Sequence, residues 1–257
     1  MKTNYHTHTL LCNHAVGSVE DYIKEAINNK FDIIGISDHA RIPSYIMSEN
    51  DYTSEHLDTY MTELEFNNIY LKDIRMCQKK YTNIKIYVSL EIDYNNLLHS
   101  HYEYLLGILD YLVLGIHHFF ADGKKYNSYY DLNEDNVILY AKTIENALST
   151  GYFKYLAHPD LFLYSINNPS KNCEIASKMI IESCIKNGCY LEINCNGYPH
   201  YPTYFFYNIA SKYKGTKFIL GYDAHNPKLL KGEHIKPITD LITKLGLKLE
   251  EKLDFLD

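Results

Sequence analysis

Short β-branched or apolar runs alternate along the chain with longer segments of helical periodicity, and this alternation constrains the fold most strongly. Seven runs are expected to be strands, over residues 3–8, 32–37, 84–91, 111–116, 153–157, 190–194 and 217–221. Strands separated by helices run parallel, and repeated right-handed crossovers give either a doubly wound sheet or a closed barrel. Periodicity alone does not choose between these two architectures.

Residue types at the ends of the helical segments mark where the helices begin and end. Ser18 is expected to cap the first helix, because its hydroxyl can accept from free N–H groups there and acidic residues follow in the first turn. Gly151, Gly188 and Gly246 fall where later helices should stop. The other helices are expected near residues 55–80, 133–149, 173–187, 204–213 and 234–245. These seven β-then-α units have no obvious linker, which predicts a single domain over residues 1–257.

Metal-binding and acid–base side chains follow all seven expected strands at their carboxyl ends. In chain order they are His6, His8 and His14, then Asp38 and His39, Glu91, His117 and His118, His158 and Asp160, Glu192 and Asn194, and Asp223 and His225. In a parallel barrel these strand ends share one face, where the active sites of such folds lie. A lone histidine at a strand end is more often a hydrogen-bonded structural residue, but repetition at seven strand ends favours a shared site.

The spacing of His6 and His8 indicates metal binding. Alternation along a strand directs both side chains to the same side, so the two imidazoles can bind one ion. Imidazole suits Zn and Fe, whereas carboxylates can bridge two ions or bind harder ions such as Mn. About nine candidate ligands, at about four to six per ion and with shared carboxylates, would allow two or three divalent ions.

The charge of the chain limits its partners. A formal net charge of −7 argues against broad affinity for nucleic acid or for a membrane, because both need a basic protein surface. Arginine occurs only at Arg41 and Arg75, so a bound phosphate would need positive charge from elsewhere, which metal ions could supply. The six cysteines contain no C-x-x-C pair, and we expect buried, reduced thiols in a cytoplasmic protein.

An ordered set of motifs resembles the PHP (polymerase and histidinol phosphatase) superfamily, and within it the monofunctional histidinol-phosphate phosphatases. The motifs are His6-x-His8, His14, Ser37-Asp38-His39, Leu90-Glu91, Leu114-Gly115-Ile116-His117, Ala157-His158-Pro159-Asp160-Leu161, Glu192-Ile193-Asn194 and Gly221-Tyr222-Asp223-Ala224-His225. The resemblance covers nearly the whole chain in order. It implies an α/β fold, a distorted seven-stranded (β/α)7 TIM-like barrel, with a trinuclear centre of Zn, Fe or Mn.

The resemblance also implies how three metal sites would share the ligands. The first would use His6, His8, Glu91 and Asp223, the second Glu91, His117 and His158, and the third His14, His39 and His225. His117 is preferred to His118 by the ungapped count from the start of its strand, and adjacent strand residues point to opposite faces. Asp38 either fixes an imidazole tautomer or caps a helix, and the sequence leaves both open.

Hydrolysis of a small phosphate monoester is the activity that the resemblance implies, with histidinol phosphate of histidine biosynthesis as the expected substrate. We expect a hydroxide that bridges the metal ions to attack phosphorus. Asp223 or His225 would protonate the leaving alkoxide. Glu91 would support this chemistry as the bridging carboxylate.

Contacts to the substrate are expected from three further residues. Arg41 could clamp the phosphate. Glu192 and Asn194 could contact an amine or an imidazole, although Glu192 could instead serve barrel packing. Some members of the family carry arginines where this chain has Tyr164 and Asn196. These departures weaken the expectation of histidinol phosphate and leave phosphoester hydrolysis untouched.

Other functions stay open from the sequence. A phosphoesterase of this superfamily could act instead on a nucleotide, a sugar phosphate or a phosphotyrosine. A metal-dependent amidohydrolase also opens with H-x-H, but it would normally need a bridging lysine or another carboxylate at mid-chain, and Glu91 with Asp38-His39 fits the PHP order better. A non-catalytic metal-binding barrel is the alternative from another class. The sequence sets neither the metal identity nor the oligomeric state.

Overall fold

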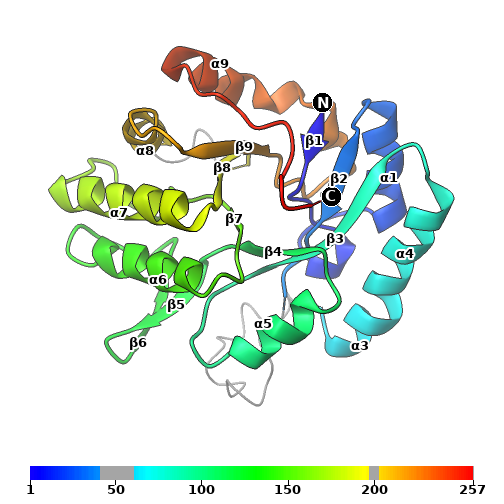
Figure 1. Ribbon diagram of the computed structural model, residues 1–257, viewed down its shortest axis with the longest axis horizontal. Coiled ribbons are helices and arrows are strands. Elements are labelled where there is room, and N and C mark those ends of the chain that lie inside the picture. The colour runs from blue at the N-terminus through cyan, green and yellow to red at the C-terminus, as the bar shows by residue number, and fades with distance from the viewer. Residues whose placement is uncertain (41–60, 197–202, 257) are drawn as a thin grey trace.

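Seven parallel strands form one sheet in the computed structural model, which describes residues 1–40, 61–196 and 203–256. In sheet order they are β1 (Thr3–Asn4), β2 (Ile33–Ile36), β3 (Lys85–Ile92), β4 (Tyr111–Leu114), β7 (Tyr155–Leu156), β8 (Tyr190–Asn194) and β9 (Lys217–Gly221). The strands follow one another around a ring (Figure 1) and pair in parallel throughout. Each is therefore joined to the next by a crossover, as the sequence predicts.

The ring is nearly closed between its first and last strands. Thr7 and Ala224, just beyond β1 and β9, form an isolated parallel bridge, and the His8 N–H donates to the Ala224 carbonyl at 3.0 Å. The Asn4 side chain accepts from the Tyr222 N–H at 3.0 Å. These few bonds join the two edges, so the architecture is a distorted barrel and not an open doubly wound sheet.

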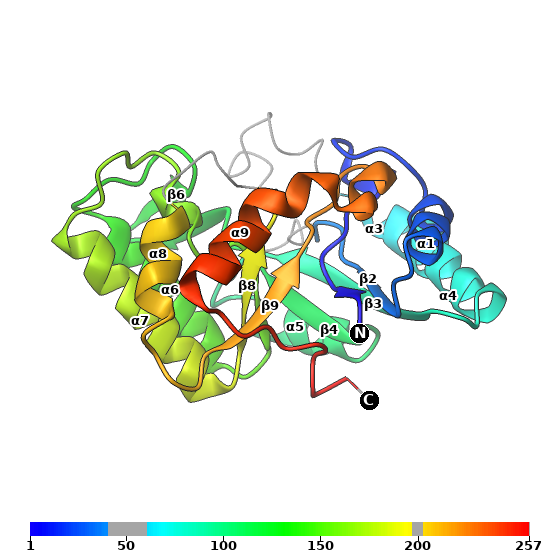
Figure 2. The ribbon, with the colours of Figure 1, turned by 90° about the horizontal axis from the view of Figure 1, so that it is seen from above.

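The helices lie outside the ring of strands (Figures 1 and 2). They are α1 (Val19–Asn28), α3 (Glu63–Glu65), α4 (Leu71–Lys80), α5 (His99–Leu106), α6 (Val137–Ser149), α7 (Lys171–Asn187), α8 (Thr203–Ala210) and α9 (Lys236–Leu245). Short helical turns are η1 (Leu10–Cys12), η2 (Phe66–Tyr70), η3 (Leu161–Leu163), η4 (Pro227–Lys231) and η5 (Glu233–Ile235). None of the described helices is both long and apolar enough to cross a membrane.

The predicted helix signals are confirmed where the structure describes them. Ser18 caps α1 through a capping box, in which its hydroxyl accepts from the Asp21 N–H and the Asp21 carboxylate accepts from the Ser18 N–H at 2.8 Å. Gly188 and Gly246 cap the ends of α7 and α9 with φ near +60°. Gly151 follows Thr150, the residue that caps the end of α6, and has a φ of 80°. The local helix chemistry thus supports the same crossovers as the strand pattern.

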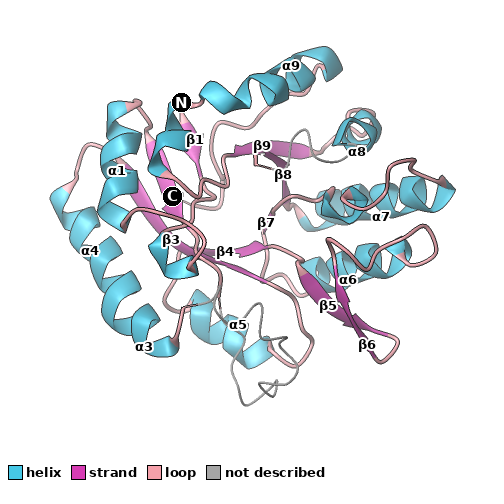
Figure 3. Ribbon diagram, turned by 180° about the vertical axis from the view of Figure 1, so that it is seen from behind, coloured by secondary structure: helices cyan, strands magenta, loops and turns pink. Residues whose placement is uncertain are grey.

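An antiparallel hairpin that the sequence reading did not predict follows β4. It consists of β5 (His118–Ala121) and β6 (Lys124–Asn127), and it projects beside α6 (Figure 3). Asp122 and Gly123 form its turn with φ of 50° and 72°, the left-handed conformation that two-residue hairpin turns need. The Asp-Gly pair was a readable signal for this turn. The hairpin matters because the loop after it reaches the candidate site.

The first strand is shorter than the predicted range of residues 3–8. Only Thr3 and Asn4 belong to the ladder with β2. Beyond them the Asn4 side chain accepts from the His6 N–H at 3.3 Å and donates to the Thr7 hydroxyl at 2.7 Å, which takes this stretch out of the regular ladder. The segment that carries His6 and His8 is therefore shaped by side-chain bonds.

Alternate residues of the strands face the interior of the barrel and fill it in layers. Five buried tyrosines form the layer nearest the amino ends of the strands: Tyr5, Tyr87, Tyr111, Tyr155 and Tyr190. Nearer the carboxyl ends stand the carboxylates of Glu91 and Glu192. A Cβ on Gly115 would overlap the Glu91 carboxylate, and one on Gly221 would overlap that of Glu192. Because these two glycines have no side chain, both carboxylates have space to extend toward the barrel axis.

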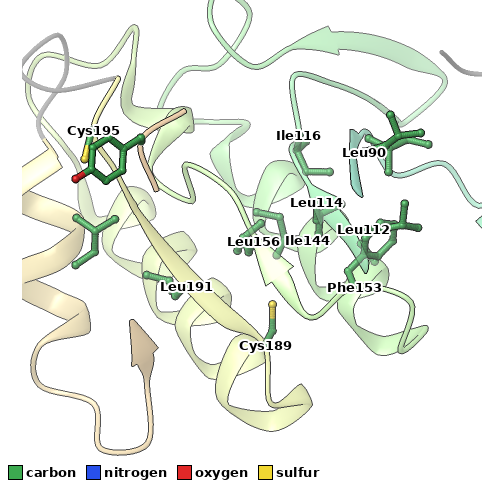
Figure 4. Close-up of a cluster of buried hydrophobic side chains, with 14 of the residues drawn as sticks. Leu90, Leu112, Leu114, Ile116, Ile144, Phe153, Leu156, Cys189, Leu191 and Cys195 are labelled. Carbon is green, nitrogen blue, oxygen red and sulfur yellow. The ribbon is translucent and has the colours of Figure 1, made fainter. Parts of the chain in front are cut away.

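A larger apolar cluster fills the space between the sheet and the helices (Figure 4). Leu112 and Leu114 of β4 pack there with Ile144 of α6, and Leu156 of β7 joins them. All six cysteines, which lie within the described ranges, are buried and unpaired. This confirms the expectation that they serve as small apolar side chains.

The C-terminal segment covers the tyrosine layer, and Leu253 is fully buried against it. The Tyr87 hydroxyl donates to the Leu256 carbonyl at 2.9 Å. Leu253→Ala is expected to lower the free energy of unfolding by about 3 kcal/mol, because the rigid rings around it cannot fill the cavity that is left. Urea unfolding measures this, with Leu64→Ala as the control because Leu64 is 73% exposed. Equal midpoints for the two variants would contradict the prediction.

Candidate metal centre

The structure brings all nine predicted metal ligands together at the carboxyl ends of the strands. Six of them line a cavity of about 460 Å³: His14, His39, Glu91, His117, Asp223 and His225. The other three, His6, His8 and His158, are buried and lie against Glu91. The cavity is open to solvent, so a ligand can reach the group from outside.

The carboxylate of Glu91 is the shared contact of this group. Its oxygens face the ring nitrogens of five histidines, at 2.7 Å from His158, 3.6 Å from His117, 3.0 Å from His39 and 3.4 Å from both His6 and His8. Glu91 Oε2 is buried and accepts no hydrogen bond from the described residues. A buried carboxylate oxygen surrounded by nitrogens without hydrogen-bond geometry is the arrangement expected around a cation.

Two pairs of histidines point their ring nitrogens at one another. His6 Nε2 lies 2.9 Å from His8 Nε2, and His14 Nε2 lies 3.0 Å from His225 Nε2. Asp223 Oδ1 lies 3.1 Å from His8 Nε2 and 3.5 Å from His6 Nε2. Nitrogen and carboxylate donors that converge at such distances fit divalent ions such as Zn, Fe or Mn. The residues present therefore suit the predicted metal cluster.

His39 belongs to more than one group of neighbouring donors. Its donor atom lies within 4.8 Å of those of Glu91 and His117, and also of those of His8 and His225. The resemblance implied that His39 would serve only the third site. The geometry shows it between the groups, so its assignment to one ion stays a prediction.

Cys12 was read from the sequence as a small apolar residue, yet it lies at the edge of this cluster. Its Sγ is within 4.8 Å of the donor atoms of His14 and His225. Burial, reinforced by the charge of Asp38, raises the pKa of the Cys12 thiol to about 12. The thiol is therefore neutral at physiological pH, which agrees with the apolar reading.

Electrostatics favour the metal-binding protonation state at Glu91, Asp223 and His8, whereas the surrounding carboxylates outweigh burial and raise the pKa of His6 and of His158. Burial would raise the pKa of Glu91, but His117, His6 and His39 outweigh it and hold that pKa well below its ordinary value. Burial is likewise outweighed at Asp223, whose pKa is low because of His6 and a hydrogen bond from His8. The pKa of His8 is lowered by burial and by neighbouring histidines. Ionised carboxylates beside a neutral imidazole are ready to bind a cation.

Glu192 lies behind the candidate ligands and not in the cavity. It is fully buried, and its carboxylate accepts from His6 Nδ1 at 2.9 Å, from the Tyr155 hydroxyl at 2.7 Å and from the His158 N–H at 2.7 Å. The Asn194 amide adds a fourth bond at 2.9 Å. The expected contact between Glu192 and substrate does not fit this position, because protein donors already occupy both oxygens. The alternative, a structural role in the barrel, fits it.

Asn194 is also buried and turned toward the protein. Its amide donates to Asp223 Oδ2 at 3.1 Å, and its carbonyl oxygen accepts from the Asn196 N–H at 2.7 Å. The expected substrate contact does not fit this geometry either. Asn194 instead holds the carboxylate of Asp223 in place, which leaves the other Asp223 oxygen directed at His8 and His6.

Two buried aspartates support the loops that carry the candidate ligands. Asp38 accepts from the Thr9 N–H at 2.5 Å and from the Thr9 hydroxyl at 2.6 Å, so it ties down the loop after His8. The two roles read from the sequence, a partner for an imidazole and a helix cap, stay predictions. Asp93, which sequence reasoning missed, accepts from the backbone N–H groups of His117 at 2.6 Å and His118 at 3.0 Å. The sequence could have indicated Asp93, because it lies two residues after Glu91 and so points to the same side of the chain.

His117 and His118 point in different directions, as the alternation argument predicts. His117 Nε2 faces the Glu91 carboxylate, and the His117, His39 and Glu91 donors lie within 4.8 Å of one another. The two ring nitrogens of His118 lie near Asp93 Oδ2, at 3.9 Å, and near the Asn127 amide, at 3.2 Å. This arrangement favours His117 as the ligand.

Alanine at each of the two histidines tests this choice. His117→Ala is expected to reduce the bound metal and to lower kcat/KM at least about a hundredfold, because a ligand to the reaction centre is lost. His118→Ala is expected to keep the metal stoichiometry. Elemental analysis of both purified variants, beside a phosphatase assay, measures the difference. Loss of metal only in His118→Ala would show that the ligand had been assigned to the wrong residue.

The remaining wall of the cavity is aromatic and polar. Tyr129, Tyr130 and Tyr164 line it together with His118, Asn127 and Asn196. Tyr164 and Asn196 are the two positions where some family members carry arginine, and both face the cavity in which a phosphate ester would lie. Arg41, the expected phosphate clamp, lies outside the described residues.

The fold and the site together define a TIM-like barrel with a candidate centre for several divalent metal ions at its carboxyl end. A family model described as the PHP domain matches residues 4–196. The chain therefore belongs to the PHP family. The roles of individual ligands stay predictions.

Similar proteins agree with this membership. A Deinococcus radiodurans protein named "Probable histidinol-phosphatase" is 24% identical over 238 residues, covering 86% of this chain and 85% of that protein. A Listeria monocytogenes structure, proposed to be a histidinol phosphatase, has a TM-score of 0.77 at 20% identity and covers 92% of this chain and 99% of its own. A histidinol phosphate phosphatase from Lactococcus lactis, complexed with zinc, L-histidinol and phosphate, has a TM-score of 0.70 at 18% identity, with 96% and 95% covered. These structures confirm the predicted barrel.

Proposed function

We propose that the protein is a metal-dependent phosphomonoesterase. The observation that carries this proposal is the convergence of five histidines on Glu91 beneath an open cavity. A dianionic phosphate ester needs positive charge around its oxygens, and no lysine or arginine lines the described part of this cavity. Clustered divalent ions would neutralise that charge and lower the pKa of an attacking water.

Three groups of side chains would hold the ions. His6, His8, Glu91 and Asp223 form the first, Glu91, His117 and His158 the second, and His14, His39 and His225 the third. The first is supported by mutual donor distances within 4.8 Å for His6, His8 and Glu91, and the third by the 3.0 Å approach of the His14 and His225 nitrogens. Two or three ions are expected, and zinc is supported by the ligand of the Lactococcus lactis protein.

Asp223 is the proposed proton carrier of the reaction. Its Oδ1 lies among the candidate ligands, 3.1 Å from His8 Nε2 and 3.5 Å from His6 Nε2, where it could accept the proton of an attacking water. As the water oxygen bonds to phosphorus and the ester P–O bond breaks, Asp223 would pass this proton to the leaving alkoxide. His225 suits the role of donor less well, because Nδ1 bonds the Asp223 carbonyl oxygen at 3.0 Å and Nε2 faces His14.

Histidinol phosphate is the proposed substrate, supported by the names of the Deinococcus radiodurans and Lactococcus lactis relatives. The test is phosphate release from histidinol phosphate by purified protein of measured metal content, beside a nucleotide, a sugar phosphate and a phosphotyrosine peptide. We expect the highest kcat/KM with histidinol phosphate, and loss of activity on chelation that Zn, Fe or Mn restores. Bound metal without any phosphatase activity would favour a non-catalytic barrel. The cytoplasmic location stays a prediction.

A further inference from the structure

Three tyrosines form a continuous aromatic surface on the cavity, named here the tyrosine wall: Tyr129, Tyr130 and Tyr164. The Tyr129 ring stacks on that of His117, with centroids 6.1 Å apart and an interplanar angle of 11°. Tyr164 meets Tyr129 at 83° and 5.1 Å, and it meets Tyr130 at 90° and 6.2 Å. The wall therefore begins at a predicted metal ligand and contains two right-angled corners between rings.

The tyrosine wall is held in place by two segments far apart in the chain. After the β5–β6 hairpin, the Ser128 N–H donates to the His117 carbonyl at 2.8 Å, and the Tyr129 N–H donates to Asn127 Oδ1 at 2.8 Å. After β7, the Ser165 hydroxyl donates to the Tyr129 carbonyl. These bonds fix the backbone next to the rings, so the surface is formed before any ligand binds.

Ring chemistry, and not charge, is what this surface offers to a ligand. No lysine or arginine lines the described part of the cavity, whereas Tyr130 is 72% and Tyr164 is 38% exposed. A corner between perpendicular rings suits a flat ring, which can stack on one tyrosine while it meets the other with its edge. Because tyrosine faces carry negative potential, a cationic ring is accepted as well.

We propose that the tyrosine wall is the leaving-group subsite, that it selects phosphate monoesters whose alcohol carries a flat aromatic ring, and that Tyr164 is a specificity-determining residue. This inference rests on the proposed phosphatase function and deepens it by naming the substrate class. Histidinol phosphate is one member of that class, and its imidazole would lie against the wall while the phosphate lies at Glu91 and Asp223.

A matched pair of substrates tests the preference. Leucinol phosphate has the same amino-alcohol backbone as histidinol phosphate, with an isopropyl group in place of the imidazole. We expect kcat/KM for histidinol phosphate to exceed that for leucinol phosphate about tenfold, the gain that aromatic contacts of this kind provide. Hydrolysis of both substrates at the same kcat/KM would overturn the inference and leave the phosphatase function standing.

Variants locate the preference on the wall. Tyr164→Ala is expected to lower kcat/KM for histidinol phosphate about fivefold more than for leucinol phosphate, whereas Tyr164→Phe keeps the ratio because it keeps the ring. Tyr104→Ala is the matched control, since Tyr104 is a 52% exposed tyrosine on α5 outside the cavity lining. An equal loss on both substrates in Tyr164→Ala would show a merely structural role and would also overturn the inference.

A binding measurement separates this inference from catalysis. Benzylphosphonate and cyclohexylmethylphosphonate have the same number of carbon atoms and the same charged group, but only the first carries a flat ring. Neither can be hydrolysed as an ester, so calorimetry with metal-loaded protein needs no turnover. We expect severalfold tighter binding of the benzyl compound, and loss of that difference in Tyr164→Ala. Such a preference without any phosphatase activity would contradict the proposed function but support the role of the tyrosine wall in binding a ring. Equal affinity, or no binding of either compound, would overturn the wall's role.

Discussion

Glu91→Gln is expected to abolish metal binding and phosphatase activity together, with kcat/KM lowered at least about a thousandfold. The carboxylate lies within 3.6 Å of the ring nitrogens of five histidines, so it is the contact common to the first and second proposed sites. The amide of glutamine carries no charge to bridge two cations, and its N–H groups would face the ring nitrogens. The loss corresponds to the several kcal/mol that metal ions contribute to the transition state.

Elemental analysis and phosphate release measure the two effects on the same preparation. Glu134→Gln is the matched control, because Glu134 is an exposed residue outside the cavity lining. Far-UV circular dichroism should show both variants folded, since glutamine has the shape of glutamate. Full metal content with full activity in Glu91→Gln would refute the central position given to this carboxylate.

Much of the site was predictable because, in a strand, the spacing of two residues determines whether their side chains point to the same side. His6 and His8 were expected on one side, and their nitrogens are indeed 2.9 Å apart. The parallel order of the strands placed Glu91 and Asp223 on the same face, although 132 residues of sequence numbering separate them. Local periodicity and a single rule about parallel barrels were enough for this part of the prediction.

The depth of each side chain could not be predicted in the same way. Glu192 and Asn194 follow the pattern of strand-end polar residues as well as Glu91 does, yet they are buried behind the ligands. Their depth depends on how far the barrel closes at Gly221, which is a property of the whole ring. The role of Asp38 depends on the same closure, because its partner Thr9 comes from another strand end.

The tyrosine wall was beyond sequence reasoning for a related reason. Tyr129 follows a hairpin and Tyr164 follows β7, and no periodic pattern links two loops. The Asp122-Gly123 turn could have revealed the hairpin, but only the folded chain shows that its exit loop meets the later turn at the Ser165–Tyr129 bond. Contacts between loops depend on their detailed conformations, which spacing does not encode.

Glu192→Ala is expected to weaken both the fold and the metal centre. Four donors would lose their acceptor at once: His6 Nδ1, the Tyr155 hydroxyl, the His158 N–H and the Asn194 amide. Unpaired buried donors, and a buried His6 left without its carboxylate partner, should lower the free energy of unfolding by about 3–5 kcal/mol. The His6 imidazole would also lose the partner that orients it, and metal affinity should fall about 10–100-fold.

Glu192→Gln separates the effect on stability from the effect on metal affinity. Glutamine keeps the side-chain volume and one acceptor oxygen, but its NH2 group faces a donor that the carboxylate accepts from in the wild type. We expect a smaller loss of stability than in Glu192→Ala, with metal affinity still reduced. Urea unfolding and a competitive metal titration measure the two quantities, and Glu182→Ala, an exposed residue of α7 bonded to the Tyr213 hydroxyl, is the control. Wild-type stability and metal affinity in Glu192→Ala would mean that His6 is positioned without this carboxylate, and the barrel interior would then need a different account.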